Sequence, residues 1–369
     1  MQKGKIMTKY EKKLFKALCS FKNKDFDHQL LEHATPEVLG QLFYNRMQAV
    51  AYGVLKENGV LGKVNREFRN SLKIAYEDNQ KKNESFFRCL KYLFELLEKS
   101  KCRYAMLKGA YLCGAYPTAY RTSNDIDLLV SPSDITKIGN ILLGAGFKQG
   151  KAVGDVFVPA SRQEIIRSRM MYGETVPYVK EVNLPGMRFL EIDINFSLDY
   201  KPGDTREVEK MLNNTVLCEV NGITIRTLCR NDFFVHLCTH LYKEATTLPW
   251  VEMKRDMTLY KYADIYMLLN DMSNLEVDDL FEDVKACESE LVCSYAIFQM
   301  SKLFLFENMY AFNRAKRALS KNPDFINTVF SPRDGKRYLF KNKSIEGRFF
   351  SVMETSRNNL VIFSLLLPQ

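Results

Sequence analysis

The chain has 369 residues, more than the roughly 100–200 residues of a typical domain, so two or three structural parts are expected. With 46% hydrophobic residues, the composition excludes a disordered, collagen-like or coiled-coil protein. The formal net charge of +9 gathers in residues 3–24 and 333–348, which we interpret as solvated surfaces or, alternatively, as surfaces that attract polyanions.

The cysteines and the hydropathy of the sequence indicate where in the cell the protein is located. The nine cysteines are scattered and form no Cys-X-X-Cys pair, which argues against a disulfide framework and against a zinc ribbon. No apolar run follows the basic start, and the apolar residues 360–367 fall short of the about 20 needed to cross a bilayer. The sequence therefore predicts a cytoplasmic protein with no membrane partner.

The first part of the chain, residues 1–100, is predicted to be a helical lobe with few Gly or Pro interruptions. Near its end, apolar residues recur at the spacing of one amphipathic helical stripe. These residues are Phe86, Leu90, Leu93, Phe94 and Leu97.

The pattern changes after this lobe. Residues 104–107 form a short apolar strand that ends at Lys108 and Gly109, and a helix follows over residues 110–116. Pro117 ends that helix, because proline disfavours the helical conformation in the residue before it.

Residues 125–130, Asp-Ile-Asp-Leu-Leu-Val, predict a strand that is buried at its apolar end. Residues 131–134 supply capping groups for a helix over 135–143. Asn221-Gly222 predicts a tight hairpin turn between two strands. The further strands are expected at 156–158, 176–182, 189–196, 215–220 and 223–227.

Helical spacing returns after residue 229 and continues to about residue 320. A loop is expected over residues 331–335 and a last helix over residues 349–366. The predicted organisation is an α+β or α/β core over 101–228, between the N-terminal helical lobe and a C-terminal helical lobe with tail over 229–369.

Two aspartates carry the strongest chemical signal. On a strand, Asp125 and Asp127 project from the same face, while Ile126 and Leu128 face the other way. Two adjacent carboxylates repel each other unless a cation lies between them, and oxygen ligands suit Mg²⁺ or Mn²⁺. The alternative is a purely structural pair, although aspartate is disfavoured in strands.

Residues that could bind phosphate precede this strand. Lys108 and Gly109 lie between a strand end and a helix start, where free N–H groups favour an anion and glycine lets the backbone approach closely. Lys108 supplies a point charge, and Arg121 supplies a forked donor for the same phosphates.

These residues resemble a known family. Lys108-Gly109, Tyr116-Pro117, Arg121, the strand 125–130 and Gly146-Phe147 are similar to the bacterial uncharacterised nucleotidyltransferase family, a branch of the DNA polymerase beta-like superfamily. The resemblance covers residues 104–147 well and extends more loosely to about residue 270. It implies a nucleotidyltransferase core, which is a small mixed sheet with flanking helices.

The resemblance also implies a third carboxylate on a later strand. Asp193 matches that position, with Glu191 on the same strand face as the reserve candidate. Asn195 and Phe196 replace the His and Trp that the family usually carries there. The alternative is that Glu191 and Asp193 merely face solvent on an edge strand.

The resemblance implies the transfer of a nucleoside monophosphate from an NTP, such as ATP, to a hydroxyl acceptor. Asp125, Asp127 and Asp193 would be catalytic residues and ligands of Mg²⁺ or Mn²⁺. Lys108, Gly109 and Arg121 would bind the nucleotide. Ser123 would contribute a hydroxyl there or, alternatively, would serve as a turn residue.

The acceptor, two alternative functions and the roles of three further residues stay open. The acceptor is a small molecule, a protein or an RNA, and a toxin–antitoxin or defence enzyme acting on tRNA or a protein is one alternative. A catalytically silent nucleotide-binding module is another. His236, His240 and Asp264 would line the nucleotide cleft or serve structural roles, and sequence does not choose between these.

Overall fold

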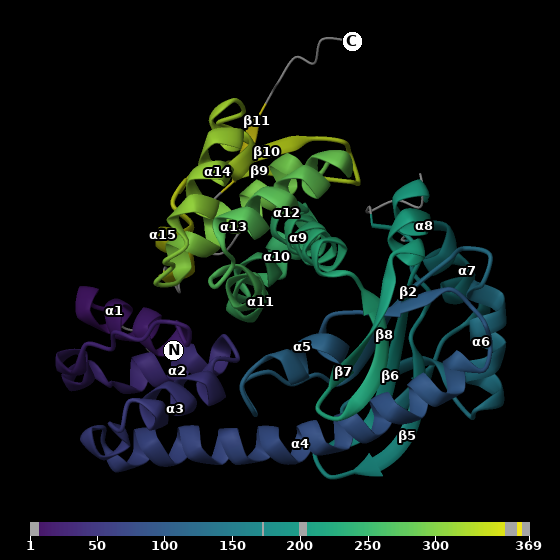
Figure 1. Cartoon of the computed structure of the whole chain (residues 1–369), viewed down its shortest axis with the longest axis horizontal. Helices are drawn as coiled ribbons and strands as arrows, with labels where there is room; N and C mark the ends of the chain where they lie inside the picture. Colours follow the sequence, from purple (N-terminus) through teal and green to yellow (C-terminus); the bar gives the residue numbers. More distant parts are fainter. Residues whose placement is uncertain (1–6, 172, 199–204, 351–359, 364–369) are drawn as a thin grey trace. The chain divides into compact units, whose positions relative to one another are not determined.

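The computed structural model describes residues 7–171, 173–198, 205–350 and 360–363 (Figure 1). The chain forms two compact units, one made of Met1–Lys73 with Leu237–Gln369 and the other of Ile74–His236. The predicted α/β core, 101–228, lies within the second unit, while the predicted division into three parts stays a prediction. In the described part of the chain, no helix has the length and apolar character needed to cross a membrane.

The first unit is mainly helical. Its N-terminal helix begins with a capping box, in which Thr8 Oγ1 accepts a hydrogen bond from the Glu11 backbone N–H at 3.2 Å. The N-terminal segment contains α1 (Lys9–Cys19), η1 (His28–His33), α2 (Pro36–Tyr44), α3 (Gln48–Glu57), η2 (Leu61–Lys63) and the start of α4 (Arg66–Glu98).

The C-terminal segment of this unit is helical up to Ser320, as predicted. It contains most of α9 (Arg230–Thr246), then α10 (Leu248–Glu252), η3 (Arg255–Met257), α11 (Leu259–Leu269), α12 (Asn274–Ala286), α13 (Glu290–Leu303), α14 (Met309–Ser320) and η4 (Phe325–Asn327).

The tail differs from the prediction. After η4 the structure has α15 (Ile345–Phe350) and an antiparallel sheet of β9 (Thr328–Phe330), β10 (Arg337–Phe340) and β11 (Leu360–Phe363), in the order β11-β10-β9. The expected helix over 349–366 is therefore wrong at 360–363, while 351–359 and 364–366 lie outside the described residues. Leu-Val-Ile-Phe is a short apolar, β-branched run whose periodicity alone cannot distinguish helix from strand.

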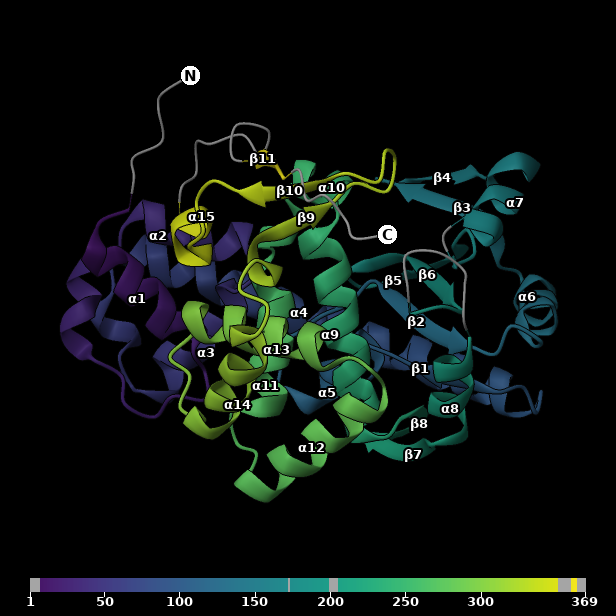
Figure 2. The same ribbon diagram turned by 90° about the horizontal axis from the view of Figure 1, so that it is seen from above.

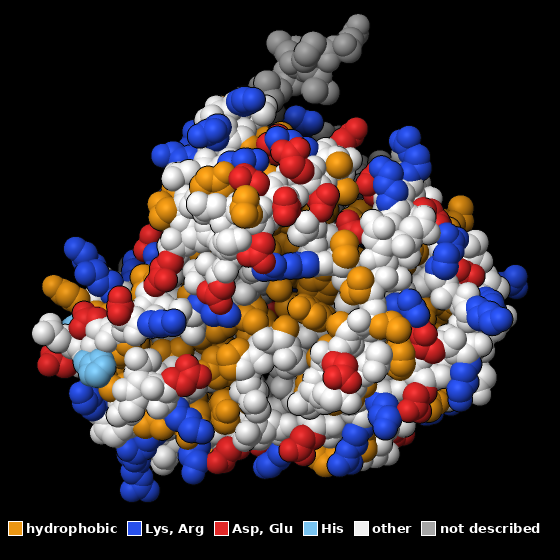
Figure 3. Space-filling model, in the orientation of Figure 1, with side chains coloured by type: hydrophobic (Ala, Val, Ile, Leu, Met, Phe, Trp, Pro, Cys, Tyr) orange, Lys and Arg blue, Asp and Glu red, His pale blue; other side chains and the backbone are white. Residues whose placement is uncertain are grey.

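The basic N-terminal run partly forms internal ion pairs. Lys16 Nζ lies 3.2 Å from Glu346, and Lys22 Nζ lies 2.6 Å from Asp271. On the face shown in Figure 3, Lys and Arg side chains are interspersed with Asp and Glu side chains. The net positive charge does not gather into one patch on that face.

The second unit is the α/β part of the chain. It contains the end of α4, then β1 (Tyr104–Met106), α5 (Gly109–Ala115), β2 (Asp125–Val130), α6 (Ile135–Gly144), β3 (Lys148–Val153), β4 (Val156–Pro159), α7 (Arg162–Met171), β5 (Tyr178–Leu184), β6 (Met187–Asn195), α8 (Arg206–Asn213), β7 (Thr215–Val220), β8 (Ile223–Leu228) and the start of α9.

Six strands form one mixed sheet in the order β1-β2-β6-β5-β3-β4. Strands β2 and β6 are parallel, and the other neighbouring pairs are antiparallel. Figure 2 shows β3 and β4, with α7 beside them, at the end of the sheet remote from β1. A mixed sheet with flanking helices is thus confirmed.

Strands β7 and β8 form a separate hairpin. Its turn residues Asn221 and Gly222 have φ values of 51° and 72°, the positive values that the predicted tight turn requires. The Thr227 hydroxyl donates to the Met106 carbonyl at 2.6 Å and ties β8 to β1.

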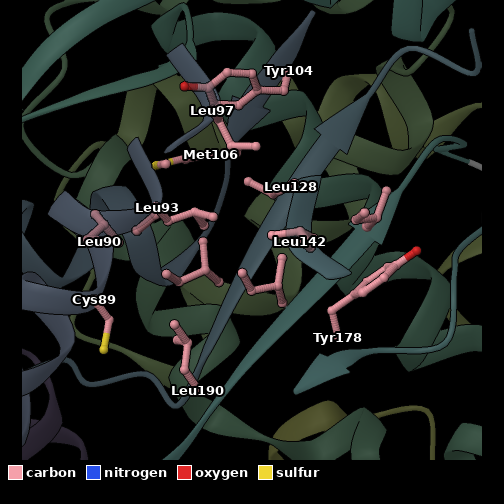
Figure 4. Packing of buried hydrophobic residues seen from close by; sticks show 14 of the residues in the cluster. Cys89, Leu90, Leu93, Leu97, Tyr104, Met106, Leu128, Leu142, Tyr178 and Leu190 are labelled. Atoms are coloured by element: carbon pink, nitrogen blue, oxygen red, sulfur yellow. The ribbon is translucent and has the colours of Figure 1, made fainter. Parts of the chain in front are cut away.

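The core of this unit lies between α4, α6 and one face of the sheet (Figure 4). The predicted stripe on α4 is correct: Phe86, Leu90, Leu93 and Leu97 are fully buried, and Phe94 packs against the cluster. From the sheet, Ile126 and Leu128 of β2 join Ile192 and Ile194 of β6 in this core. The opposite face of these two strands is left for polar side chains.

Several local expectations change. Strand β3 and helices α7 and α8 were not predicted; for β3 and α7 the reason is a polar composition with little apolar periodicity. Asp134 precedes the first residue of α6 but makes no capping bond; its carboxylate accepts the Arg103 backbone N–H at 3.0 Å instead.

Candidate active site

Four carboxylates lie on one face of the paired strands β2 and β6. In the parallel register, Asp125 lies opposite Glu191 and Asp127 lies opposite Asp193. Alternation along each strand directs all four side chains to the face opposite the core. Because β6 is an inner strand of the sheet, Glu191 and Asp193 do not lie on a solvated edge strand.

Lys108 brings a positive charge to this face. Its Nζ lies 2.6 Å from Asp127 Oδ1, and the two side chains are only 18% and 6% exposed. The Lys108 backbone has φ 43° and ψ −114°, an unusual conformation for a residue with a side chain. The Lys108 carbonyl accepts the Leu112 N–H at 2.8 Å, and the Leu107 N–H donates to the Asp127 carbonyl at 2.9 Å. The turn that carries this lysine is therefore held against β2.

Gly109 and Ser123 fit together beside the carboxylates. A Cβ atom added to Gly109 would lie 2.5 Å from Ser123 Cβ, so only glycine lets the turn pass this close. The Ser123 hydroxyl donates to Asp125 Oδ1 at 2.6 Å. In this structure Ser123 therefore orients a carboxylate, while its two sequence-based roles, a phosphate contact or a turn residue, stay predictions.

The carboxylates differ in their proton affinity. Burial raises the pKa of Asp193 well above its ordinary value, and the charges of Asp127 and Asp125 raise it further. Burial also raises the pKa of Asp127, although the Lys108 ammonium acts in the opposite direction.

Burial would likewise raise the pKa of Asp125. The Ser123 hydrogen bond and the Lys108 charge more than offset this effect, so the pKa of Asp125 lies below its ordinary value. For Lys108, burial opposes the charged form, but Asp127 and the other carboxylates outweigh it and the pKa is raised. The face thus combines a charged Lys108 with more carboxylates than this lysine neutralises.

Arg121 lies on the loop that leads into β2. Its charge lowers the pKa of both Asp125 and Asp127, behind larger effects of burial and Lys108. Two asparagines of α4 hold this loop: Asn83 Nδ2 donates to the Arg121 carbonyl at 3.0 Å, and Asn79 Nδ2 donates to the Ala119 carbonyl at 2.9 Å. Sequence reasoning missed both asparagines; the signal was a pair of amides four residues apart on a helix that also carries a buried apolar stripe.

Glu191 is engaged in a different way from Asp193. The Ala152 backbone N–H of β3 donates to Glu191 Oε1 at 3.2 Å. Burial raises the pKa of Glu191, and this backbone bond partly opposes the shift. Glu191 therefore links the β3–β4 hairpin to the carboxylate face.

The remaining candidates are distributed over both units. His236 is buried at the end of the α/β unit. In the helical unit, His240 Nε2 lies 3.5 Å from Glu244, and Lys261 forms an ion pair with the same carboxylate. Asp264 is buried in α11. Lys261 and His240 thus share one acidic neighbour within the helical unit.

The donor set of the carboxylate face fits a hard divalent cation. Mg²⁺ prefers carboxylate oxygens and usually takes only one or two of them, together with waters and substrate phosphates. Among the described residues, no group of three or more His, Cys, Asp or Glu side chains is arranged so that it could hold a metal ion by itself. Asp125 and Asp127 would hold such a cation, with Asp193 beside Asp127 as a further oxygen donor.

Comparisons with known proteins add the following findings. The profile of a family described as "Uncharacterised nucleotidyltransferase" matches residues 34–305, more than half of the chain. A crystal structure of an antigenic nucleotidyltransferase-like protein from Paracoccidioides brasiliensis is 13% identical; the match covers 55% of this chain and 89% of that chain with a TM-score of 0.33. Among curated proteins, no match was found.

Proposed function

The chain belongs to the uncharacterised nucleotidyltransferase family, and on this premise we propose that it transfers a nucleoside monophosphate from an NTP to a hydroxyl acceptor. One observation carries the proposal: the parallel register of β2 and β6 sets Asp127 beside Asp193, with the Lys108 ammonium 2.6 Å from Asp127. Carboxylates gathered beside a lysine on one sheet face suit a cation-bound triphosphate.

Asp125 and Asp127 would hold Mg²⁺ or Mn²⁺ in this proposal. When bound, the cation would offset the charge of the triphosphate and polarise the reacting phosphorus. Asp125 suits this part because the Ser123 hydrogen bond and the Lys108 charge keep it ionised. Asp127 would meet the cation once Lys108 turns to a phosphate.

Asp193 would act on the acceptor. Its raised pKa makes this carboxylate a better proton acceptor than an ordinary aspartate, as a general base requires. It would take the proton from the acceptor hydroxyl as that oxygen attacks the α-phosphorus. The bond from the α-phosphorus to the bridging oxygen breaks, and pyrophosphate leaves.

Lys108 and Arg121 would bind the phosphates. The lysine supplies a mobile point charge, and the arginine supplies a forked set of donors for phosphate oxygens. Gly109 contributes by letting the turn lie against Ser123. Helix α5 has only seven residues, and the side chains of Lys108 and Arg121 rather than the helix end would hold the phosphates.

The acceptor is a small molecule, a protein or an RNA end, and ATP is the expected donor. The toxin–antitoxin or defence role is one form of the same chemistry, with tRNA or a protein as acceptor. The cytoplasmic location and the place in the DNA polymerase beta-like superfamily stay predictions.

A labelling experiment tests the proposed function. The full chain is incubated with each of the four α-³²P-labelled NTPs and Mg²⁺ or Mn²⁺, in the presence of total RNA, protein lysate or a small-molecule extract. We expect label to enter one acceptor class and to fall by about 10²–10⁴-fold in Asp127→Asn. Lys137→Met is a matched control, because Lys137 donates to the Ser100 carbonyl elsewhere in the unit. If no condition gives transfer, or if Asp127→Asn transfers as well as the wild type, the silent-module alternative becomes the better one.

A further inference from the structure

We propose that Lys108 is the resident counter-ion of the carboxylate face, that it exchanges between Asp127 and a bound triphosphate, and that this exchange makes metal and triphosphate binding cooperative. The inference rests on the proposed function and describes how that site is regulated. It concerns equilibrium binding, so it is measurable without any transfer reaction.

The first step is competition for one oxygen. Lys108 Nζ lies 2.6 Å from Asp127 Oδ1, at the distance of a strong charge-assisted hydrogen bond. Asp127 is 6% exposed, so little of this carboxylate meets solvent and the ammonium is its close charged partner. A divalent cation that uses this oxygen must displace the ammonium, and a bound ammonium therefore weakens the binding of metal alone.

The second step is the fate of the displaced lysine. Its side chain is largely buried, at 18% exposure, so a free ammonium there would be poorly solvated. A triphosphate bound to the metal offers oxygens of opposite charge beside the same face. The lysine then gains a phosphate partner at the moment at which it loses Asp127.

The third step is that the backbone can stay still while the side chain moves. The Lys108 carbonyl is fixed by the N–H groups of Tyr111 and Leu112, at 3.2 and 2.8 Å. The adjacent Leu107 N–H is bonded to the Asp127 carbonyl at 2.9 Å. The four-carbon stem of lysine supplies the rotation, so the exchange requires no movement of β2.

The consequence is a linkage of the two ligands. Triphosphate removes the competitor of the metal, and metal frees the lysine that binds triphosphate. By thermodynamic reciprocity each ligand strengthens the other by the same factor, which for such couplings is about 5–150-fold.

Two binding measurements on the full chain test the inference. Mn²⁺ alone is titrated and followed by the electron paramagnetic resonance signal of the free ion, and inorganic tripolyphosphate without metal is titrated by calorimetry. For Lys108→Met, which is similar in length but uncharged, we expect Mn²⁺ to bind about tenfold more tightly and tripolyphosphate about tenfold more weakly. Asp127→Asn should lose Mn²⁺ binding, and Lys137→Met should match the wild type in both titrations.

The test depends on the affinities for Mn²⁺ and for tripolyphosphate changing in opposite directions. A lysine that only binds phosphate would leave Mn²⁺ affinity unchanged, and a lysine that only supports the fold would weaken both ligands; either result would overturn the inference. Lys108→Gln replaces Lys108→Met if the latter fails to fold, with the same expected signs. If the protein transfers label but the Lys108 variant shows neither change in affinity, only the proposed exchange of Lys108 is rejected. If both affinities change as expected but no transfer occurs, only the proposed function is rejected.

Discussion

Two clusters of ionisable groups on the same α/β unit differ in how their charges balance. In the first, Glu98 Oε1 accepts from Arg226 Nε at 2.8 Å and from the Tyr104 hydroxyl at 2.8 Å, and Glu98 Oε2 accepts from Arg226 Nη2 at 2.9 Å. In the second, Asp125, Asp127, Glu191 and Asp193 share a sheet face with Lys108.

The pKa shifts express this difference. The Arg226 hydrogen bond lowers the pKa of Glu98, so folding favours its charged form. Burial and neighbouring carboxylates raise the pKa of Asp193, so folding disfavours its charged form. A cluster that satisfies its own charges stabilises the fold, whereas a cluster with excess charge of one sign is suited to a ligand of the other sign.

The largest expected effect is on transfer activity, and it distinguishes Asp193 from Glu191, the two carboxylates of β6. Asp193→Asn should reduce transfer by about 10²–10⁴-fold, because the proposed base is lost while the amide keeps the shape of the side chain. Glu191→Gln should reduce it by less than about tenfold, since an amide oxygen can still accept the Ala152 N–H. Initial rates of label transfer measure both variants. A larger loss in Glu191→Gln would make Glu191 the third carboxylate.

The next effect concerns how much the cluster of Glu98, Arg226 and Tyr104 stabilises the fold. Glu98→Gln should lower the free energy of unfolding by about 2 kcal/mol, because Arg226 loses a charged partner that is only partly screened by solvent. The lowered pKa of Glu98 means that its contribution is present above about pH 4.3 and is lost as pH falls through the folded-state pKa. Urea unfolding at several pH values measures this. If Glu98→Gln is as stable as the wild type at pH 7, the Glu98 cluster does not stabilise the fold, and the difference between the two clusters that we infer is wrong.

A smaller effect is expected at Ser123. Ser123→Ala removes the hydrogen bond to Asp125 and should reduce transfer by about tenfold, as is typical for a group that orients a ligand. The loss should be partly recovered as pH rises, because Asp125 would then need less help to ionise. Rate–pH profiles of the two proteins make the comparison. Identical profiles would mean that Ser123 is only a turn residue.

The smallest effect tests whether a raised pKa alone marks a site. Burial raises the pKa of Asp256, in the helical unit, to about 7. Because this value exceeds the unfolded one, about 3.9, Asp256 stabilises the fold less as pH rises between the two. Asp256→Asn should therefore be more stable than the wild type by about 1 kcal/mol at pH 8, with unchanged transfer. Loss of transfer in a stable variant would link the helical unit to catalysis.

The fold was predictable where local patterns decide structure. The apolar stripe on α4, the Asn221-Gly222 turn and the strand over 125–130 follow from spacing within a few residues. The structure of the tail was not predictable in this way, since β11 depends on pairing with β10, whose partner residues lie 20 to 26 positions earlier in the chain. The Ala152–Glu191 bond was equally hidden, because it joins β3 and β6, which are separated along the chain by two strands and a helix.

By itself, the sequence determined that Asp125 and Asp127 share one strand face, because alternation along a strand is a local property. Only the tertiary structure decided that Asp193 lies beside Asp127 and that Lys108 turns toward them. That arrangement depends on the parallel register of β2 and β6, and burial of their apolar side chains in the common core sets which side chains point to the opposite face. Side chains far apart in sequence meet on the carboxylate face because apolar side chains meet on the opposite face.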